Sequence, residues 1–280
     1  MVRFGLKSFL CQLGLLTYCT FTPESHVMKI RTTTTITLLI ACCFSLLGSL
    51  SIAQETLLSQ SNRAQLQELI DSPNRSEDAR VRNQFRNPLP TLDFFDVRPE
   101  LTVVEIWPGG QGGWYRSILE PYITGNGTYV PVREASGFPE PVTDLVANNS
   151  ADRVLVFRAH GFMIYEPAAQ DYYHALFAML KPGGIFGIVD HRGDEAVPQD
   201  PAGENGYVNQ SHVIMLAENA GFELLETAEI NANSMDNKDH PNGVYSLPPT
   251  LRGSLINRRF RAEMVEIGES DRMTLKFVKP

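Results

Sequence analysis

Cysteine is scarce in this sequence. The 280 residues contain four cysteines, at positions 11, 19, 42 and 43, and none follows Cys43. The body of the chain therefore has no disulfide, no cysteine-ligated metal and no catalytic thiol. Its chemistry has to come from other side chains.

Basic residues are also in short supply, with 24 Lys and Arg against 32 Asp and Glu. This acidic balance argues against nucleic acid or an anionic membrane as the main partner. Hydrophobic residues make up 43% and charged residues 20% of the chain, which is ordinary for a globular protein. We therefore expect a small-molecule substrate or a component of the cell envelope.

The sequence has no apolar run long enough for a stable transmembrane span. The apolar segment Ile36 to Leu50 follows a basic start, Met28 to Arg31, and precedes the small-residue triplet Ser51-Ile-Ala53. This order is typical of a secretory signal peptide and predicts cleavage after Ala53 and export, with the periplasm as destination. Residues 1–27 are either an upstream extension or part of a long leader.

A lipoprotein cleavage site is an alternative within the same segment, because Leu39-Ile-Ala-Cys42 resembles the lipoprotein box. It is less favoured, since the apolar run continues past Cys42. Removal of residues 1–53 takes away four basic residues and one acidic residue, and leaves 20 basic against 31 acidic residues, a net charge of −11.

The usual dinucleotide fingerprint G-x-G-x-x-G is absent too. In its place, Leu101 to Trp107 reads as a buried strand, and Pro108 to Gly113 contains four glycines in six positions. Apolar residues then recur at helical spacing from Trp114 to Tyr122. Strand, glycine-rich turn and helix form the first unit of a nucleotide-binding α/β fold, in which the N-terminus of the helix faces an anion.

Three motifs resemble those of a group of bacterial predicted methyltransferases with the class I fold, which depend on S-adenosylmethionine (SAM). They are Val103 to Tyr122, which resembles the P-G-G-G-W-Y motif although Gln111 and an extra glycine lengthen the loop; Leu180-Lys-Pro-Gly-Gly184 before an apolar strand; and Ala220-Gly-Phe222. The resemblance implies a Rossmann-like class I methyltransferase sheet with helices on both faces, and SAM as cofactor.

One region departs from the family pattern. Only the residues from Arg133 to Asp152 separate the expected strands Thr128 to Val132 and Arg153 to Arg158, and they hold a short helix at most, at Val142 to Ala147. The third strand of the family is therefore predicted to be missing. The later elements are expected to be helices at 168–180 and 208–220, strands at 185–189 and from 220 onward, and a closing strand at 272–278 that belongs to an antiparallel pair.

The chain is predicted to divide into a leader at 1–53, an N-terminal helical extension at 54–98 and a methyltransferase-like domain at 99–280. The extension is expected to hold helices at 56–70, from 76 to before Pro88, and at 91–95. It either forms a lid over the cofactor or packs on the sheet as a structural layer, and the second role is the commoner one. Four arginines at 252, 258, 259 and 261 make a local basic patch, expected to be a solvated loop.

The resemblance also implies the site residues. A cofactor would be held by Glu105, Trp107, Gly109, Gly110, Gly112, Gly113, Glu134 and Arg158, with Glu134 at the ribose. His160, Asp190 and His191 are candidates for the catalytic base. For Glu134 a solvated loop carboxylate, and for His160 a structural role, are the competing interpretations.

The predicted function is SAM-dependent methyl transfer to a small-molecule or envelope substrate. Such a reaction needs the nucleophile and the methyl group held in line with water excluded, and a base where the nucleophile carries a proton. The alternative is a non-catalytic binding or structural protein on a degenerate scaffold, because SAM is made and kept in the cytoplasm. A metal-dependent hydrolase using Asp190, His191 and Asp194 lacks a recognised ligand spacing.

Overall fold

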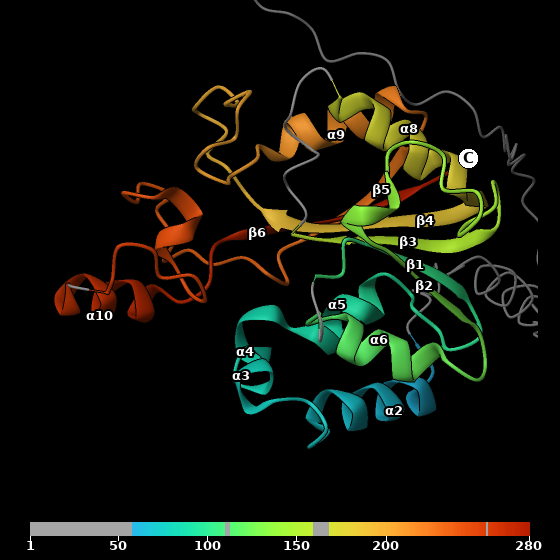
Figure 1. Cartoon of the computed structure of the whole chain (residues 1–280), viewed down its shortest axis with the longest axis horizontal. Coiled ribbons are helices and arrows are strands. Elements are labelled where there is room, and N and C mark those ends of the chain that lie inside the picture. The colour runs from blue at the N-terminus through green and yellow to red at the C-terminus, as the bar shows by residue number, and fades with distance from the viewer. Residues whose placement is uncertain (1–57, 110–112, 159–167, 256) are drawn as a thin grey trace, which may run out of the picture. The chain divides into compact units, whose positions relative to one another are not determined.

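A six-stranded sheet organises the chain (Figure 1). The computed structural model describes residues 58–109, 113–158, 168–255 and 257–280. In spatial order the strands are β2, β1, β3, β4, β6 and β5. Their bounds are Thr102–Ile106 (β1), Thr128–Val132 (β2), Ala151–Phe157 (β3), Leu180–His191 (β4), Glu223–Ala228 (β5) and Arg272–Val278 (β6).

Strand directions follow a simple rule. β2, β1, β3 and β4 are parallel, whereas β6 runs antiparallel to both of its neighbours, β4 and β5. The predicted Rossmann-like α/β sheet and the predicted closing antiparallel pair are confirmed. β4 is longer than expected, because the segment Lys181 to Gly184 lies within the strand.

β2 is an edge strand, and no strand lies between it and β3 in the sequence. Residues 133–150 contain one short 3-10 helix, η1 (Glu134–Ser136), and a series of turns. The predicted loss of the third strand is therefore confirmed. A short helix at most was expected at 142–147, and the backbone makes a turn there, with the N–H groups of Leu145 and Val146 both donating to the carbonyl of Val142.

One face of the sheet carries α8 (Ala169–Met179) and α9 (Gln210–Asn219), which lie above the strands in Figure 1. Alternate strand residues point to this face, because successive side chains of a strand lie on opposite sides. Val104, Val154 and Ile188 are buried there against Leu176 of α8 and other apolar residues of the two helices.

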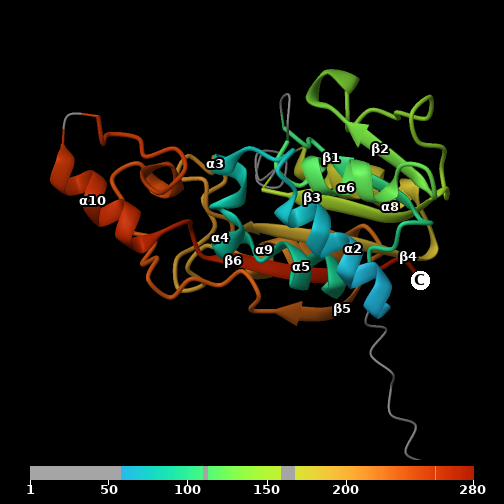
Figure 2. The ribbon, with the colours of Figure 1, turned by 90° about the horizontal axis from the view of Figure 1, so that it is seen from below.

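The opposite face carries α2 (Gln60–Asp71), α5 (Pro88–Phe94) and α6 (Arg116–Ile123). Figure 2, seen from below, shows these helices in front of the strands. Val103 and Leu155 are buried against Ile118 of α6 and Phe95. Gly187 of β4 makes room for Phe95, since a Cβ atom at this position would come within 2.8 Å of the ring.

The N-terminal extension packs on the sheet domain, and Gln54–Pro280 forms one compact unit. Its second predicted helix is divided into α3 (Glu77–Arg80) and α4 (Asn83–Arg86). Trp114, next to α6, anchors these short helices: its indole N–H donates to the carbonyl of Ala79 at 2.8 Å, and the guanidinium of Arg86 lies 4.8 Å from its ring. α2 and α5 act as the expected packing layer, whereas α4 reaches the end of the sheet where β4 finishes.

The basic patch predicted as a loop is largely helical. α10 (Arg258–Ile267) begins at Asn257, whose side chain accepts a hydrogen bond from the N–H of Phe260, and Arg259 pairs with Glu263 in solvent. A second 3-10 helix, η2, spans Gly243–Ser246. Within the described ranges, no helix has the length and apolar character needed to cross a membrane.

Candidate functional site

The sheet has a topological switch point between β1 and β3. After β1 the chain passes to β2 on one side, and after β2 it returns to β3 on the other side. The connections that leave the carboxyl ends of β1 and β3 thus diverge and open a crevice, which is where open α/β sheets bind their ligands. The predicted glycine-rich loop follows β1 at this point.

The residues that follow β1 and β3 share an unusual backbone conformation. Trp107 and Arg158 both have positive φ angles, 48° and 58°. Each residue still donates one sheet-like hydrogen bond: the N–H of Trp107 donates to the carbonyl of Val132 at 2.7 Å, and the N–H of Arg158 donates to that of Val189 at 2.8 Å. Left-handed backbone is uncommon for bulky residues and tends to occur at functional sites.

Two glycines of the loop are required by its geometry. Gly109 has a φ of +88°, and a Cβ atom on Gly113 would lie 1.9 Å from the carbonyl oxygen of Pro108. The backbone is thus folded closely upon itself just before α6, and a side chain at either position would disturb it. The predicted ligands Gly110 and Gly112 lie outside the described residues.

Glu105 lies beneath this loop rather than on its surface. Its side chain is 2% exposed, and one carboxylate oxygen accepts a hydrogen bond of 2.6 Å from the hydroxyl of Tyr129. Burial raises the pKa of Glu105 to about 7, although the Tyr129 hydroxyl and the charge of Arg116 act in the opposite direction. Glu105 thus links β1 to β2 and supports the start of the loop.

Aromatic side chains line the α8 side of the crevice. The ring of Trp107 lies 5.9 Å from that of Tyr172, and Tyr172 lies 5.2 Å from Phe138, both in edge contacts. Phe138 belongs to the segment that replaces the missing strand. Sequence analysis placed Tyr172 on the apolar side of a helix but did not connect it, or Phe138, with the site.

Asp190 and His191 end β4 at the same edge of the sheet, as predicted from the strand pattern. One carboxylate oxygen of Asp190 accepts the N–H of His191 at 2.7 Å, and the ring of His191 is hydrogen-bonded to the hydroxyl of Ser270. Complete burial raises the pKa of Asp190 to about 8, against the lowering effect of Arg158 and Arg272.

The structure does not describe the side chains of two other predicted site residues, His160 and Glu134. His160 lies outside the described residues. Glu134 opens η1 two positions after β2, so its backbone is at the expected edge of the sheet, but its side chain is outside what the structure describes.

Four arginines gather around one carboxylate at this edge, a feature that sequence analysis missed. We call Arg82, Arg86, Arg158 and Arg272, together with Glu269, the arginine cluster. The carboxylate of Glu269 forms ion pairs with the guanidinium groups of Arg82, Arg86 and Arg272, with N···O distances of 2.7, 2.8 and 3.1 Å. The pKa of Glu269 falls to about 2, because the arginines outweigh the effect of its burial. Up to 187 residues of sequence separate the partners, so no local pattern could have indicated the cluster.

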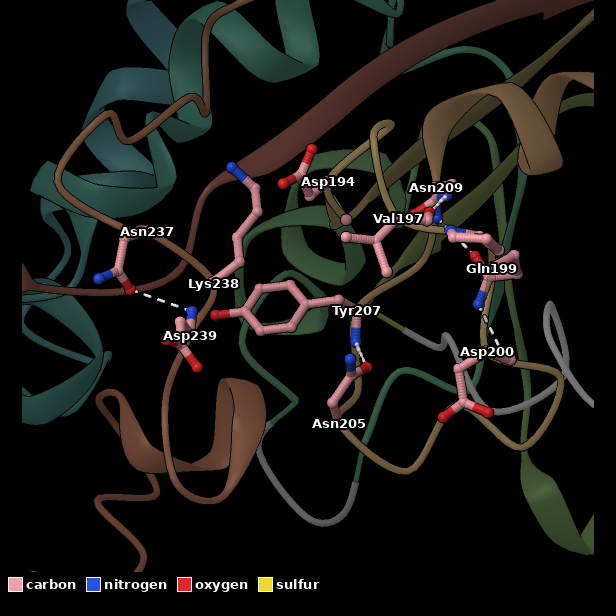
Figure 3. Close-up of a pocket in the computed structure, with 12 residues that line it drawn as sticks. Asp194, Val197, Gln199, Asp200, Asn205, Tyr207, Asn209, Asn237, Lys238 and Asp239 are labelled. Atoms are coloured by element: carbon pink, nitrogen blue, oxygen red, sulfur yellow. Dashed lines mark hydrogen bonds between the residues drawn. The ribbon is translucent and has the colours of Figure 1, made fainter.

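A cavity of about 300 Å³ lies next to the long loop that follows β4 (Figure 3). Its walls come from the long loop after β4, including Asp194, Asp200 and Tyr207, and from the segment around Lys238. Lys238 pairs with Asp271 at 3.0 Å, and Asp271 immediately precedes Arg272 of the arginine cluster. Lys238 therefore connects the lining of the cavity to the segment that precedes β6.

Two acidic residues of this cavity, Asp194 and Asp200, shape the loop after β4. Asp194 accepts the N–H of Ala196 at 2.9 Å, and Asp200 accepts those of Ala202 and Glu204. No three His, Cys, Asp or Glu side chains in the described part of the chain are placed to hold a metal ion.

No protein-family model and no curated protein matches this sequence. Solved structures do share its arrangement. The [4+2]-cyclase SpnF is 14% identical over 75% of this chain and 86% of that chain, with a TM-score of 0.46. A SAM-dependent methyltransferase from Aquifex aeolicus is 17% identical over 60% and 93%, with a TM-score of 0.42.

Geranyl diphosphate C-methyltransferase from Streptomyces coelicolor A3(2), solved with Mg²⁺, geranyl diphosphate and S-adenosyl-L-homocysteine, is 11% identical over 76% and 87%, with a TM-score of 0.44. The likeness to these proteins is one of fold. The chain's own strand order and strand directions establish that fold independently of them: a Rossmann-like α/β sheet that lacks one strand beyond β2.

Proposed function

We propose that the chain binds SAM at the loop from Trp107 to Gly113 and transfers the methyl group to an acceptor. One observation carries the proposal: a tightly folded glycine loop, with no room for a side chain at Gly113, follows β1 at the topological switch point of the sheet. In open α/β folds this is the place where a nucleotide-like ligand binds.

The proposed roles follow from position. The glycine loop would hold the methionine portion of SAM, and Glu134 at the end of β2 would approach the ribose. The aromatic group of Trp107, Phe138 and Tyr172, in T-shaped contact, includes a residue of the segment that replaces the missing third strand, Phe138. We propose that this group supplies the apolar surface for the adenine ring.

SAM, when bound, supplies an electrophilic methyl group. The residues then have to place an acceptor atom in line with it, exclude water and take up a proton where one is released. Asp190 and His191 lie at the correct edge for a base. Because the pKa of Asp190 is about 8, its carboxyl is largely protonated at neutral pH, which makes His191 the better acceptor of a proton there.

The proposed location is the periplasm, supported by the order of basic, apolar and small residues from Met28 to Ala53. An exported enzyme would act on a small molecule or a component of the envelope. The acidic balance of the chain fits such a substrate better than nucleic acid.

Calorimetric titration of the compact unit from Gln54 with SAM, and with its demethylated product, tests the proposal. We expect micromolar binding that is lost in Gly109→Arg, because the arginine would occupy the loop. Gly125→Arg is the matched control, since Gly125 also has a positive φ, at 102°, an added Cβ atom there meets nothing within 4 Å, and it precedes β2 at the opposite end of the sheet. No binding of either compound would contradict the proposal and leave a non-catalytic protein on this scaffold.

A further inference from the structure

We propose that the arginine cluster binds an oxyanion, a carboxylate or phosphate group, on the methyl acceptor. The chemical class of acceptor is thus an acidic small molecule. The identity of the ligand as an acceptor rests on the proposed methyl transfer, whereas the anion site stands on the geometry that follows.

The cluster carries an excess of positive charge. Arg82, Arg86 and Arg272 share the single carboxylate of Glu269, and the Arg158 guanidinium has no hydrogen-bond or ion-pair partner among the described residues. The remaining carboxyl near Arg158 and Arg272 is Asp190. Burial raises its pKa to about 8, so it adds little negative charge at neutral pH.

Several guanidinium nitrogens of the cluster are buried without a hydrogen-bond acceptor in the described part of the chain. They are Nη2 of Arg82, Nη2 of Arg86 and Nε of Arg272. Arg86 is 1% exposed and Arg272 is 2% exposed, so water does not compensate the missing acceptor freely. Buried donors of this kind are costly unless an acceptor is supplied, and an oxyanion supplies several at once.

A neighbouring ion network shows what a purely structural cluster looks like in this protein. Arg192 pairs with Glu229 at 2.7 Å and with Asp271 at 2.9 Å, and Lys238 pairs with Asp271. Two cations there meet two carboxylates. The arginine cluster contains four cations and one carboxylate. A cluster with a purely structural role does not need this excess of positive charge.

The position of the cluster suits the acceptor. Arg158 follows β3 directly at the switch point, and Arg272 stands opposite His191 in the register of β6 and β4. Arg82 retains 24% of its side-chain exposure and Arg158 is half-buried, so a ligand can approach from this side. Planar guanidinium groups bind carboxylate and phosphate oxygens in pairs, and several together favour an oxyanion over chloride.

The test is a titration of the purified chain with sodium phosphate, and in a second arm with sodium acetate, at ionic strength held constant with sodium chloride. The readout is calorimetry. Arg158→Gln should weaken anion binding by about tenfold or more, because it removes a charge-assisted donor without touching Glu269. Glu269→Gln, which removes the competing carboxylate, should tighten it.

Arg259→Gln is the matched control. It removes the same charge from an exposed side chain of α10 that pairs only with Glu263, and it should leave anion affinity unchanged. If phosphate binds more strongly than acetate, the acceptor is identified as a phosphorylated compound. If acetate binds more strongly, it is identified as a carboxylic acid.

Saturable binding that responds to Arg158 and Glu269 supports the site. Absence of binding in both arms, or equal binding by the wild type and Arg158→Gln, overturns it and leaves an ion network that ties α4 to β6. A parallel titration with SAM separates the two proposals. If SAM binds and the anions do not, only this inference fails; if the anions bind and SAM does not, the methyl transfer fails and the ligand is not a methyl acceptor.

Discussion

Two buried carboxyl groups, those of Glu105 and Glu269, have pKa values that are shifted in opposite directions. Glu105 is buried with a single hydrogen-bond donor, Tyr129, and its proton is held more tightly in the folded chain than in the unfolded chain. Glu269 shows the reverse, since surrounding arginines hold its pKa well below the ordinary value of 4.5. The two carboxyls therefore affect stability in different pH ranges.

Glu105 should make the folded chain less stable as the pH rises. Its pKa is about 7 when folded and 4.5 in the ordinary case, so its contribution is present below pH 4.5 and is lost on the way to pH 7. Linkage gives a loss of roughly 3 kcal/mol across this range. We expect Glu105→Gln to abolish that part of the pH dependence, as measured by urea unfolding at several pH values.

The exposed Glu223 of β5 provides the control, because Glu223→Gln should leave the pH profile of unfolding as it is in the wild type. Tyr129→Phe should shift the loss to higher pH, since the hydroxyl that favours the carboxylate is gone. A profile of Glu105→Gln that parallels the wild type would contradict the explanation.

Helices and strands differed in how far the sequence could predict them. β2 and β6 were predicted at their observed bounds, because alternation or β-branched residues together with nearby turns mark their ends. The helix from Ser76 was expected to be continuous but is divided into α3 and α4. α10 was missed although Phe260, Met264 and Ile267 recur at helical spacing, because its arginines were interpreted as a solvated loop.

The candidate site was predicted only where its residues follow strands. The ends of β1, β3 and β4 could be read from the sequence, since parallel strands meet at one edge. Arg82, Arg86 and Glu269 could not, because their meeting depends on how the extension packs against the start of β6. Tertiary contacts over such sequence distances leave no local pattern.

The edge strand β2 should be protected from pairing with other chains by Pro131. The N–H of Thr128 and the carbonyl of Val132 both point to β1, so the alternation directs the backbone groups of Tyr129 and Pro131 outward. Proline offers no N–H to an incoming strand. Pro131→Val should therefore give concentration-dependent association, detected by light scattering.

Pro201→Val is a suitable comparison, since Pro201 lies in an exposed turn away from the sheet, and this variant should remain as monodisperse as the wild type. If Pro131→Val behaved in the same way, another feature of the edge would have to protect it.

The whole chain is expected to be processed on export. In a Gram-negative host the product recovered from the periplasm should begin at Gln54, because Ser51 and Ala53 provide the small side chains that signal peptidase requires. Mass spectrometry of the periplasmic fraction checks this. Ala53→Arg should block processing, and the unprocessed precursor should accumulate.

Cys42→Ala separates the two cleavage alternatives. It should leave processing unchanged if cleavage follows Ala53, whereas loss of processing, or of membrane attachment, in this variant would favour the lipoprotein site. Recovery of the whole product in the cytoplasm would contradict export itself.

The position of β6 has a consequence for biosynthesis. β6 (Arg272–Val278) follows the other described strands in the sequence, yet it lies inside the sheet between β4 and β5 rather than at its edge. During translation β5 has no partner in the sheet until Arg272–Val278 emerges, and the arginine cluster lacks Glu269 and Arg272 until the same segment is made. The edges of β4 and β5 that pair with β6 therefore stay exposed during translation until β6 has been synthesised. The synthesis of this one segment thus completes both the pairing of the sheet and the arginine cluster.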